Sequence, residues 1–190
     1  MGRRAAPRLP RQQLPINEET TMATTLGKDI SLDRLFNEGY KAVFLAMGAH
    51  KSRLLNIEGE DLAGVHPALR FLKAFNLRGE MLAKGHVGVI GGGDSAVDAA
   101  RVALRQPGVE SVTIYYRRAK NEMPALPEEV EEAIHEGIKL EAMVSPVRIL
   151  SENGKLVGAE FIRNAEGEVD ASGRRKPEPI AGSEFAAKLD

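Results

Sequence analysis

The sequence contains no cysteine and no tryptophan among its 190 residues, and aromatic residues make up only 5% of it. Without cysteine, the chain cannot form disulfides, hold an Fe–S cluster, build a thiolate zinc site or carry a redox dithiol. Its four histidines, His50, His66, His86 and His135, are scattered without the spacing of metal ligands. We therefore predict neither a metal site nor thiol chemistry in this chain.

An excess of charge of one sign is also lacking, because 26 basic and 27 acidic residues leave a net charge of −1. No overall field attracts nucleic acid or an acidic membrane, and no apolar run reaches the length of a membrane span. Residues 1–15 are rich in arginine and proline but lack the apolar core of a secretory signal, and the prolines count against a transit peptide. We expect a cytoplasmic protein that binds neither nucleic acid nor membrane.

Apolar patterning in the first part of the chain predicts short elements. Residues 1–25 contain few apolar side chains and are predicted to be poorly ordered. Ser31 is a favourable N-cap for a short amphipathic helix that ends at Gly39. The apolar run 40–48 predicts a strand buried on both faces in a parallel sheet, and residues 67–73 predict another helix.

The middle of the chain carries the clearest pattern. A strand at 87–90, a helix at 94–105 and a strand at 112–116 form a β–α–β unit, which implies parallel strands joined by a right-handed crossover. A helix from about Pro127 to His135 and a strand at 138–144 continue this alternation. The sequence therefore predicts an α/β fold with a three-layer, Rossmann-type parallel sheet.

The pattern changes towards the C-terminus. Residues 147–150, 156–162 and the segment near 177–180 read as short strands, and Asn153-Gly154 between apolar runs is a strong hairpin signal. We expect an antiparallel β-meander appended to the Rossmann unit.

A glycine-rich turn lies between the predicted strand at 87–90 and the helix that follows. Gly91-x-Gly93-x-x-Ala96 fits the dinucleotide-binding fingerprint in its proper strand–turn–helix context. Gly91 permits the tight turn, Gly93 allows a diphosphate to approach the backbone, and Ala96 lets the helix pack close to the strand. The free N–H groups near Asp94 and Ser95 would face the anion. The plain alternative is a glycine-rich β–α turn that binds nothing.

The end of the second strand indicates which dinucleotide is bound. NAD-specific sites place a carboxylate there for the ribose hydroxyls, but this chain has Arg117, Arg118 and Lys120. Arginine can engage a 2′-phosphate bidentately, whereas an acid would repel it. We predict that Gly91, Gly92, Gly93, Asp94, Ser95, Ala96, Arg117 and Arg118 bind NADPH, with Lys120 as an additional candidate. A solvated basic loop is the alternative.

No catalytic residue is predicted. The glutamates between Glu128 and Glu132 are expected to form a solvated helix face, and Arg174-Arg175-Lys176 an exposed loop, with a docking role as the alternative. No nucleophile, general base or acid can be assembled from the spacing of the residues.

Several longer motifs together resemble the glutamate synthase small-subunit family of NADPH- and FAD-dependent oxidoreductases, which also includes the flavin and NADPH region of dihydropyrimidine dehydrogenase. They cover roughly residues 26–185 and comprise residues 42–49, 57–61, 91–101, 116–118, 122–125, 172–175 and 179–185. The resemblance implies the fold of two-dinucleotide-binding-domain flavoproteins. It also implies electron transfer from NADPH to FAD and onward to Fe–S clusters of a partner domain or subunit.

The chain departs from that family in what it lacks. It has no FAD fingerprint of its own, no cluster-binding cysteines, and Met47 stands where the family has threonine. We expect the central piece of a larger flavoenzyme: a poorly ordered segment 1–25, a part of the FAD domain and linker at 26–82, and an NADPH domain at 83–190 without its last strand. The strand at 42–47 would then lack neighbours and be prone to aggregate.

Two other functions remain in view. A disulfide reductase of the thioredoxin-reductase kind has a similar glycine turn but needs a cysteine pair, which is absent. A catalytically inactive nucleotide-binding fragment, or a subunit that depends on a partner and lacks FAD, is the non-enzymatic alternative.

Overall fold

The computed structural model describes residues 24–46, 48, 52–171 and 173–190. The chain divides into two compact units, residues 1–48 and residues 49–190. Most of the segment predicted to be poorly ordered lies outside the described residues, as do Met47, Ala49, His50 and Ser172. Among the described residues, every helix is too short or too polar to cross a membrane.

Among its described residues the first unit contains one helix, α1 (Leu32–Asn37), which begins where the sequence predicted it. The Ser31 hydroxyl accepts a hydrogen bond of 3.1 Å from the Arg34 N–H and so caps the helix. The predicted strand at 40–48 is wrong: residues 42–46 form no strand, and the Phe44 side chain is 92% exposed. A strand is stable only with a backbone partner, and no described strand pairs with this segment.

The second unit is built on a parallel sheet of three strands, β1 (Gly85–Ile90), β2 (Val109–Tyr116) and β3 (Lys139–Ala142), in the order β1-β2-β3. Helix α3 (Asp94–Leu104) connects β1 to β2, and α4 (Pro127–His135) lies between β2 and β3. The predicted β–α–β unit is therefore confirmed. The register places Ile90 beside Tyr115, so the carboxyl ends of β1 and β2 lie at the same edge of the sheet.

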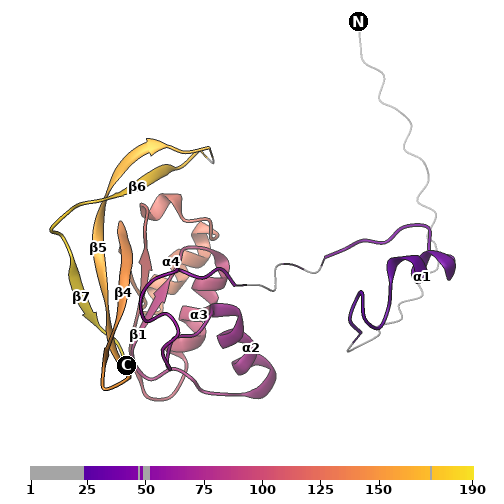
Figure 1. The fold of residues 1–190 in the computed structure, drawn as a ribbon, viewed down its shortest axis with the longest axis horizontal. Coiled ribbons are helices and arrows are strands. Elements are labelled where there is room, and N and C mark those ends of the chain that lie inside the picture. The colour runs from indigo at the N-terminus through magenta and orange to yellow at the C-terminus, as the bar shows by residue number, and fades with distance from the viewer. Residues whose placement is uncertain (1–23, 47, 49–51, 172) are drawn as a thin grey trace, which may run out of the picture. The chain divides into compact units, whose positions relative to one another are not determined.

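Helices cover one face of this sheet (Figure 1). Helix α2 (Ala68–Arg78) continues beyond the predicted end at residue 73 and stops at Gly79, whose positive φ of 65° closes the helix in the left-handed conformation. The core on this face consists largely of small and β-branched side chains: Phe71, Val97, Ala99, Ala100, Ala103, Val112, Ile114, Ala125, Val130, Ala133 and Ile138.

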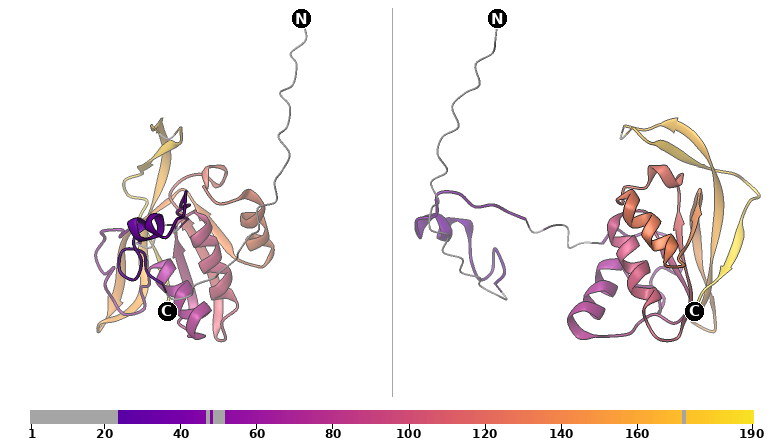
Figure 2. Two further views of the ribbon diagram at one scale, coloured as in Figure 1. Left: turned by 90° about the vertical axis from the view of Figure 1, so that its right-hand side faces the viewer. Right: turned by 180° about the vertical axis from the view of Figure 1, so that it is seen from behind.

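An antiparallel sheet covers the other face (Figure 2). It comprises β4 (Val144–Glu152), β5 (Lys155–Val169), β6 (Arg175–Pro179) and β7 (Phe185–Lys188), with β5 paired to all three others. Asn153 and Gly154 both have positive φ and join β4 to β5, as the hairpin signal predicted. The strands are longer than expected, and β7 was not predicted.

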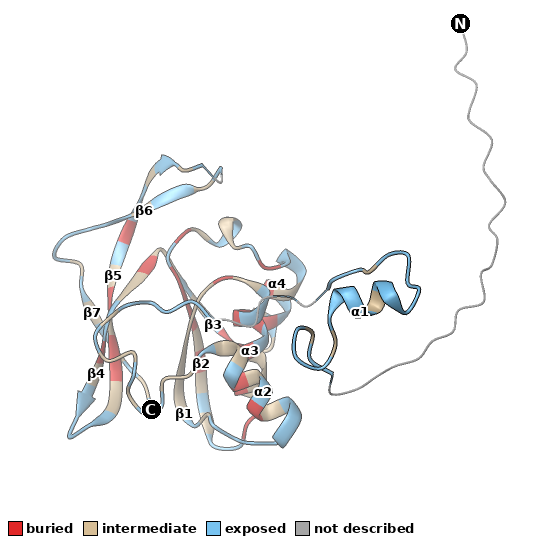
Figure 3. Ribbon diagram, turned by 45° about the vertical axis from the view of Figure 1, so that its right-hand side comes forward, coloured by how far each residue is buried: buried red, intermediate tan, exposed pale blue. Residues whose placement is uncertain are grey.

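The predicted strand at 138–144 is divided between the two sheets. β3 ends at Ala142, Met143 has a φ of 59°, and β4 begins at Val144. This one left-handed residue turns the chain out of the parallel sheet and into the antiparallel one. Buried residues lie where the layers meet (Figure 3). The predicted fold class, a three-layer α/β unit with an antiparallel meander, is confirmed.

Candidate nucleotide-binding site

The glycine turn leaves the carboxyl end of β1 and enters α3. Gly91 has a φ of 144°, which favours glycine, and its N–H donates to the Tyr115 carbonyl over 3.0 Å. A Cβ at Gly91 would lie 3.3 Å from the Cβ of Ala96. Both positions therefore need small residues, because the helix passes directly over the strand end. This is the close packing that the fingerprint predicted for Ala96.

Gly92 is required by the protein's own packing. A Cβ at this position would lie 2.5 Å from two carbon atoms of the Tyr116 ring. Its carbonyl accepts a hydrogen bond of 3.1 Å from the Ala125 N–H, and the Tyr116 hydroxyl in turn donates to the Glu122 carbonyl over 2.8 Å. Gly92 is thus enclosed between β2 and the segment that precedes α4, a role the sequence pattern did not reveal.

Gly93 has the opposite surroundings. It is the N-cap of α3, its backbone is extended at φ −94° and ψ 171°, and a Cβ added here would meet nothing within 4 Å. Its carbonyl accepts the first helical hydrogen bonds, from Ala96 over 2.8 Å and from Val97 over 3.2 Å. The N–H groups of Gly93, Asp94 and Ser95 precede those bonds and find no acceptor among the described residues. Open space in front of free N–H groups at a helix start fits a diphosphate.

The Asp94 side chain has a structural contact of its own. Its Oδ1 accepts a hydrogen bond of 3.1 Å from the backbone N–H of Leu126, the N-cap residue of α4. Together with the bond from Ala125 to Gly92, this contact fastens the segment before α4 to the glycine turn. The Asp94 carboxylate therefore braces the turn, and its backbone N–H is the group that faces the open space.

The three predicted cations differ in their surroundings. Arg117 is exposed, and no ion pair or side-chain hydrogen bond engages its guanidinium among the described residues. Arg118 is only 5% exposed, and its guanidinium pairs with Asp170 over 2.6 Å. The Lys120 ammonium lies 2.7 Å from Glu131, which lowers the pKa of that carboxyl. Arg117 is thus the cation that is available at the carboxyl edge of the sheet.

The segment after Arg118 also borders two surface hollows. One lies on the side of α4 and the other on the side of the β5–β6 hairpin. Their walls are formed by Lys120, Asn121, Met123, Ala125, Pro127, Val130 and Glu131 in the first, and by Asn121, Glu122, Met123, Pro124, Gly173 and Arg174 in the second. The residues that resemble the family motif at 122–125 therefore line the surface beside the basic residues.

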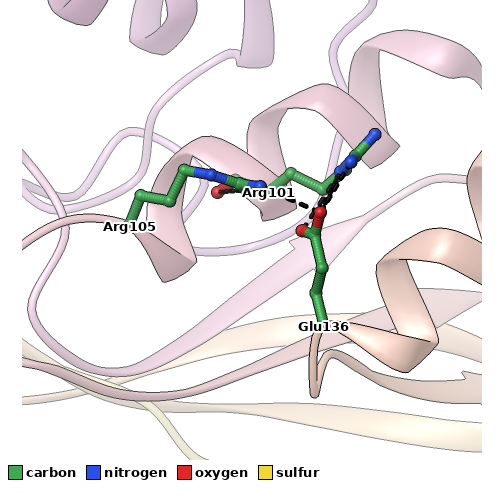
Figure 4. Close-up of polar contacts among 3 residues, drawn as sticks. All are labelled: Arg101, Arg105 and Glu136. Atoms are coloured by element: carbon green, nitrogen blue, oxygen red, sulfur yellow. Dashed lines mark hydrogen bonds and ion pairs between the residues drawn. The ribbon is translucent and has the colours of Figure 1, made fainter.

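One carboxylate joins the C-terminal ends of α3 and α4 (Figure 4). Glu136 accepts hydrogen bonds from Arg101 at 2.6 Å and from Arg105 at 2.8 Å. Hydrogen bonds from Arg101 and then Arg105 lower the pKa of Glu136 from 4.5 to about 2. Arg101, the last residue of the family-like run that begins at Gly91, therefore joins two helices rather than contributing to the glycine turn.

Of the remaining candidates, Arg175 and His86 have ordinary partners, whereas the buried Nδ1 of His66 has none among the described residues. The Arg175 N–H donates to Glu122 over 2.7 Å, and its guanidinium lies 3.2 Å from Glu166. His86 contacts the Ser111 hydroxyl at 2.9 Å, and burial lowers the pKa of His66. Among the described residues, no group of three His, Asp or Glu side chains is placed to hold a metal ion.

A glycine turn at the N-terminus of a helix, at the carboxyl edge of a parallel sheet, is the arrangement found in Rossmann units that bind dinucleotides. The family model for pyridine nucleotide-disulphide oxidoreductases matches residues 14–174. The chain belongs to the pyridine nucleotide-disulphide oxidoreductase family.

Relatives within this family agree with the predicted resemblance, which is confirmed. The chain is 47% identical over 174 residues to the NADPH-Fe(3+) oxidoreductase subunit beta of Geobacter sulfurreducens, covering 88% of this chain and 25% of that protein. It is 39% identical over 184 residues to the glutamate synthase [NADPH] small chain of Escherichia coli (strain K12), covering 90% and 39%. The chain thus spans well under half the length of these relatives.

Solved structures share the fold. FprA of Mycobacterium tuberculosis in complex with NADPH superposes with a TM-score of 0.69 at 21% identity, covering 87% of this chain and 52% of FprA. Thioredoxin reductase of T. acidophilum gives a TM-score of 0.50 at 18% identity, covering 74% and 39%. At these identities the likeness concerns the fold alone, which is that of two-dinucleotide-binding flavoproteins.

Proposed function

We propose that residues 83–190 bind NADPH and form the NADPH-binding portion of a flavin-dependent oxidoreductase of the glutamate synthase small-subunit type. The observation that carries this proposal is the open space in front of Gly93, faced by the free N–H groups at the start of α3. Arg117 at the same edge supplies the charge for a 2′-phosphate. The names of the relatives, which include NADPH oxidoreductases and NADPH-linked subunits, agree with this choice of nucleotide.

The residues that would hold NADPH are those of the turn and the loop after β2. Gly91 and Ala96 bring the helix N-terminus against the strand, Gly93 leaves room for the diphosphate, and the N–H groups of Asp94 and Ser95 donate to it. NADPH supplies a hydride when bound. The part of this chain is to position the nucleotide, since no acid, base or nucleophile is assembled at the turn.

FAD does not fit this chain in the same way. Gly91 to Ala96 is the only run of the fingerprint type in the sequence, and without cysteine no cluster ligands are present. In the proposed enzyme, FAD and the Fe–S centres therefore belong to a partner domain or subunit, to which electrons from NADPH pass. The same observation favours the second candidate, a nucleotide-binding fragment or partner-dependent subunit that is inactive by itself.

Calorimetry on the 190-residue chain tests the nucleotide assignment. A hydrogen-bonded charge pair contributes about 1.5–3 kcal/mol, so we expect NADPH to bind about tenfold or more tightly than NADH. Gly93→Val should abolish binding of both nucleotides, since the added side chain fills the diphosphate space. The melting temperature should change little, because an extended backbone with no neighbour accepts valine.

The control is Asp98→Val on the exposed side of α3, which adds the same side chain away from the turn and should leave binding intact. Equal affinities for NADPH and NADH would refute the cofactor assignment. A flavin absorbance spectrum and NADPH oxidation with a dye acceptor then separate the two candidates. Bound flavin with turnover excludes the inactive fragment, and a colourless chain that binds NADPH without oxidising it supports that fragment.

A further inference from the structure

The backbone of Arg117 and Arg118, the basic loop, is anchored to the antiparallel sheet. The Arg117 carbonyl accepts a hydrogen bond of 2.9 Å from the Asn164 side-chain amide. The Arg118 carbonyl accepts one of 3.1 Å from the Met143 N–H. Both carbonyls of the loop are therefore held by residues that lie outside the parallel sheet from which the loop emerges.

The Arg118 side chain is held by the hairpin that joins β5 and β6. Its guanidinium lies 2.6 Å from Asp170 Oδ2, and its Nε donates to the Arg175 carbonyl over 2.7 Å. The two charged side chains are only 6% and 20% exposed, so separating them would leave a largely buried charge without a partner. The Arg118 guanidinium is thus engaged within the protein and is not free to bind a phosphate.

Asn164 connects these anchors. It is 5% exposed, and its amide nitrogen donates to the Ser145 hydroxyl over 2.9 Å as well as to the Arg117 carbonyl. Its backbone N–H donates to the Met143 carbonyl over 2.7 Å. Strand β5, the start of β4 and the basic loop therefore meet at this one side chain.

We infer that Asn164 and Asp170 are positioning residues for recognition of the 2′-phosphate. They hold the backbone of the basic loop and the Arg118 side chain so that Arg117 alone presents its guanidinium to the phosphate. An arginine on an unrestrained loop would lose conformational entropy on binding, and a prepared loop avoids that loss. This inference rests on the proposed NADPH site, and it assigns the second sheet a part in choosing between NADPH and NADH.

The test measures the ratio of the NADH and NADPH dissociation constants for the 190-residue chain. Asp170→Asn keeps the shape of the side chain but removes the charge that holds Arg118. We expect NADPH to bind roughly three- to tenfold more weakly, less than the loss from removing a direct charge pair, with NADH binding unchanged. Glu160→Gln is the matched control, because it breaks the ion pair with Arg148 in the same sheet, away from the basic loop.

Arg118→Lys supplies a second variant, since lysine keeps the charge but cannot bond Asp170 and the Arg175 carbonyl together. Arg118→Lys should weaken NADPH binding about as much as Asp170→Asn. The variant with both substitutions should lose no more affinity for NADPH than either single variant. Melting temperatures of all variants confirm that the folded chain is being measured. An equal loss of affinity for NADPH and for NADH would contradict the inference.

Three results separate this inference from the proposed function. If the unsubstituted chain shows no preference for NADPH, the proposed function fails and the inference with it. If Arg117→Ala removes the preference while Asp170→Asn retains it, only the inference fails. If Asp170→Asn strengthens NADPH binding, Asp170 competes with the phosphate for Arg118, and the inference is overturned while the NADPH site stands.

Discussion

The two faces of the parallel sheet are filled by different kinds of side chain. On the helical face, the buried core residues that α3 contributes are Val97 and alanines, with Ala100 fully buried. On the other face, Tyr115 stacks on Phe161 at 4.0 Å between ring centroids, and Phe161 stacks on Phe185 at 5.8 Å. Small residues let a helix pack close to the sheet, whereas aromatic rings fill the space of about 10 Å between two packed sheets.

This difference divides the candidate site into two parts. The glycine turn depends on the helical face, because the close approach of α3 to β1 places the helix N-terminus at the strand end. The basic loop depends on the aromatic face, since its anchors come from β5, Met143 and the β5–β6 hairpin. The proposed nucleotide site is therefore assembled from two separately packed layers of the fold.

The largest effect is expected from the aromatic face. Phe161 is fully buried and stacks on two other rings, so Phe161→Ala should lower the free energy of unfolding by about 3–5 kcal/mol. Urea unfolding measures it, with Val169→Ala at an exposed position of β5 as the control, expected within about 0.5 kcal/mol of the unsubstituted chain. If Phe161→Ala lost as little stability as the control, the two sheets would not share a core.

A smaller effect is expected when the helical face is overpacked. Ala100→Leu inserts three carbon atoms where α3 meets the sheet, and should cost about 1–3 kcal/mol of stability. Because the helix must move away from β1, binding of NADPH should weaken together with stability. Asp98→Ala, on the exposed side of the same helix, should change neither. Unaltered nucleotide binding in Ala100→Leu would show that the turn does not depend on this packing.

The smallest effect concerns the ion pairs that join α3 to α4. Because the pKa of Glu136 is lowered to about 2, the folded state prefers the charged carboxylate, and this stabilisation is lost as the pH falls from about 4.5 towards 2. Glu136→Gln should therefore lower the melting temperature slightly at neutral pH, and the difference should vanish in acid. Partial exposure of the three side chains and screening by salt keep the effect small. A difference that grows as the pH falls would contradict this account.

Much of the fold was predictable because its signals are local. The alternation around Val87 to Tyr116 predicts β–α–β by itself, Asn153-Gly154 predicts a hairpin, and Ser31 predicts the start of α1. The strand predicted at 40–48 was wrong because its signal is not local. Its apolar composition is that of a buried strand, but burial needs a neighbour, and neither composition nor periodicity says whether one is present.

The local geometry of the candidate site was predictable to a similar degree, whereas its binding of a nucleotide stays a prediction. The roles of Gly91 and Ala96 follow from the fingerprint, since a positive φ and a small side chain are requirements of the turn itself. Gly92, Asp94 and Arg118 could not be interpreted in this way. Their decisive contacts are with Tyr116, Leu126 and Asp170, and the last of these lies 52 positions along the chain.

By itself the sequence determined the glycine turn and the strand–turn–helix frame around it, because backbone conformation and helix capping depend on neighbouring residues. Only the tertiary structure decided which cations remain available there. Two adjacent arginines look alike in the sequence, yet one is exposed and the other is paired within the protein. The reason is that an ion pair requires its partner to be brought close, and the antiparallel sheet is what brings Asp170 to Arg118.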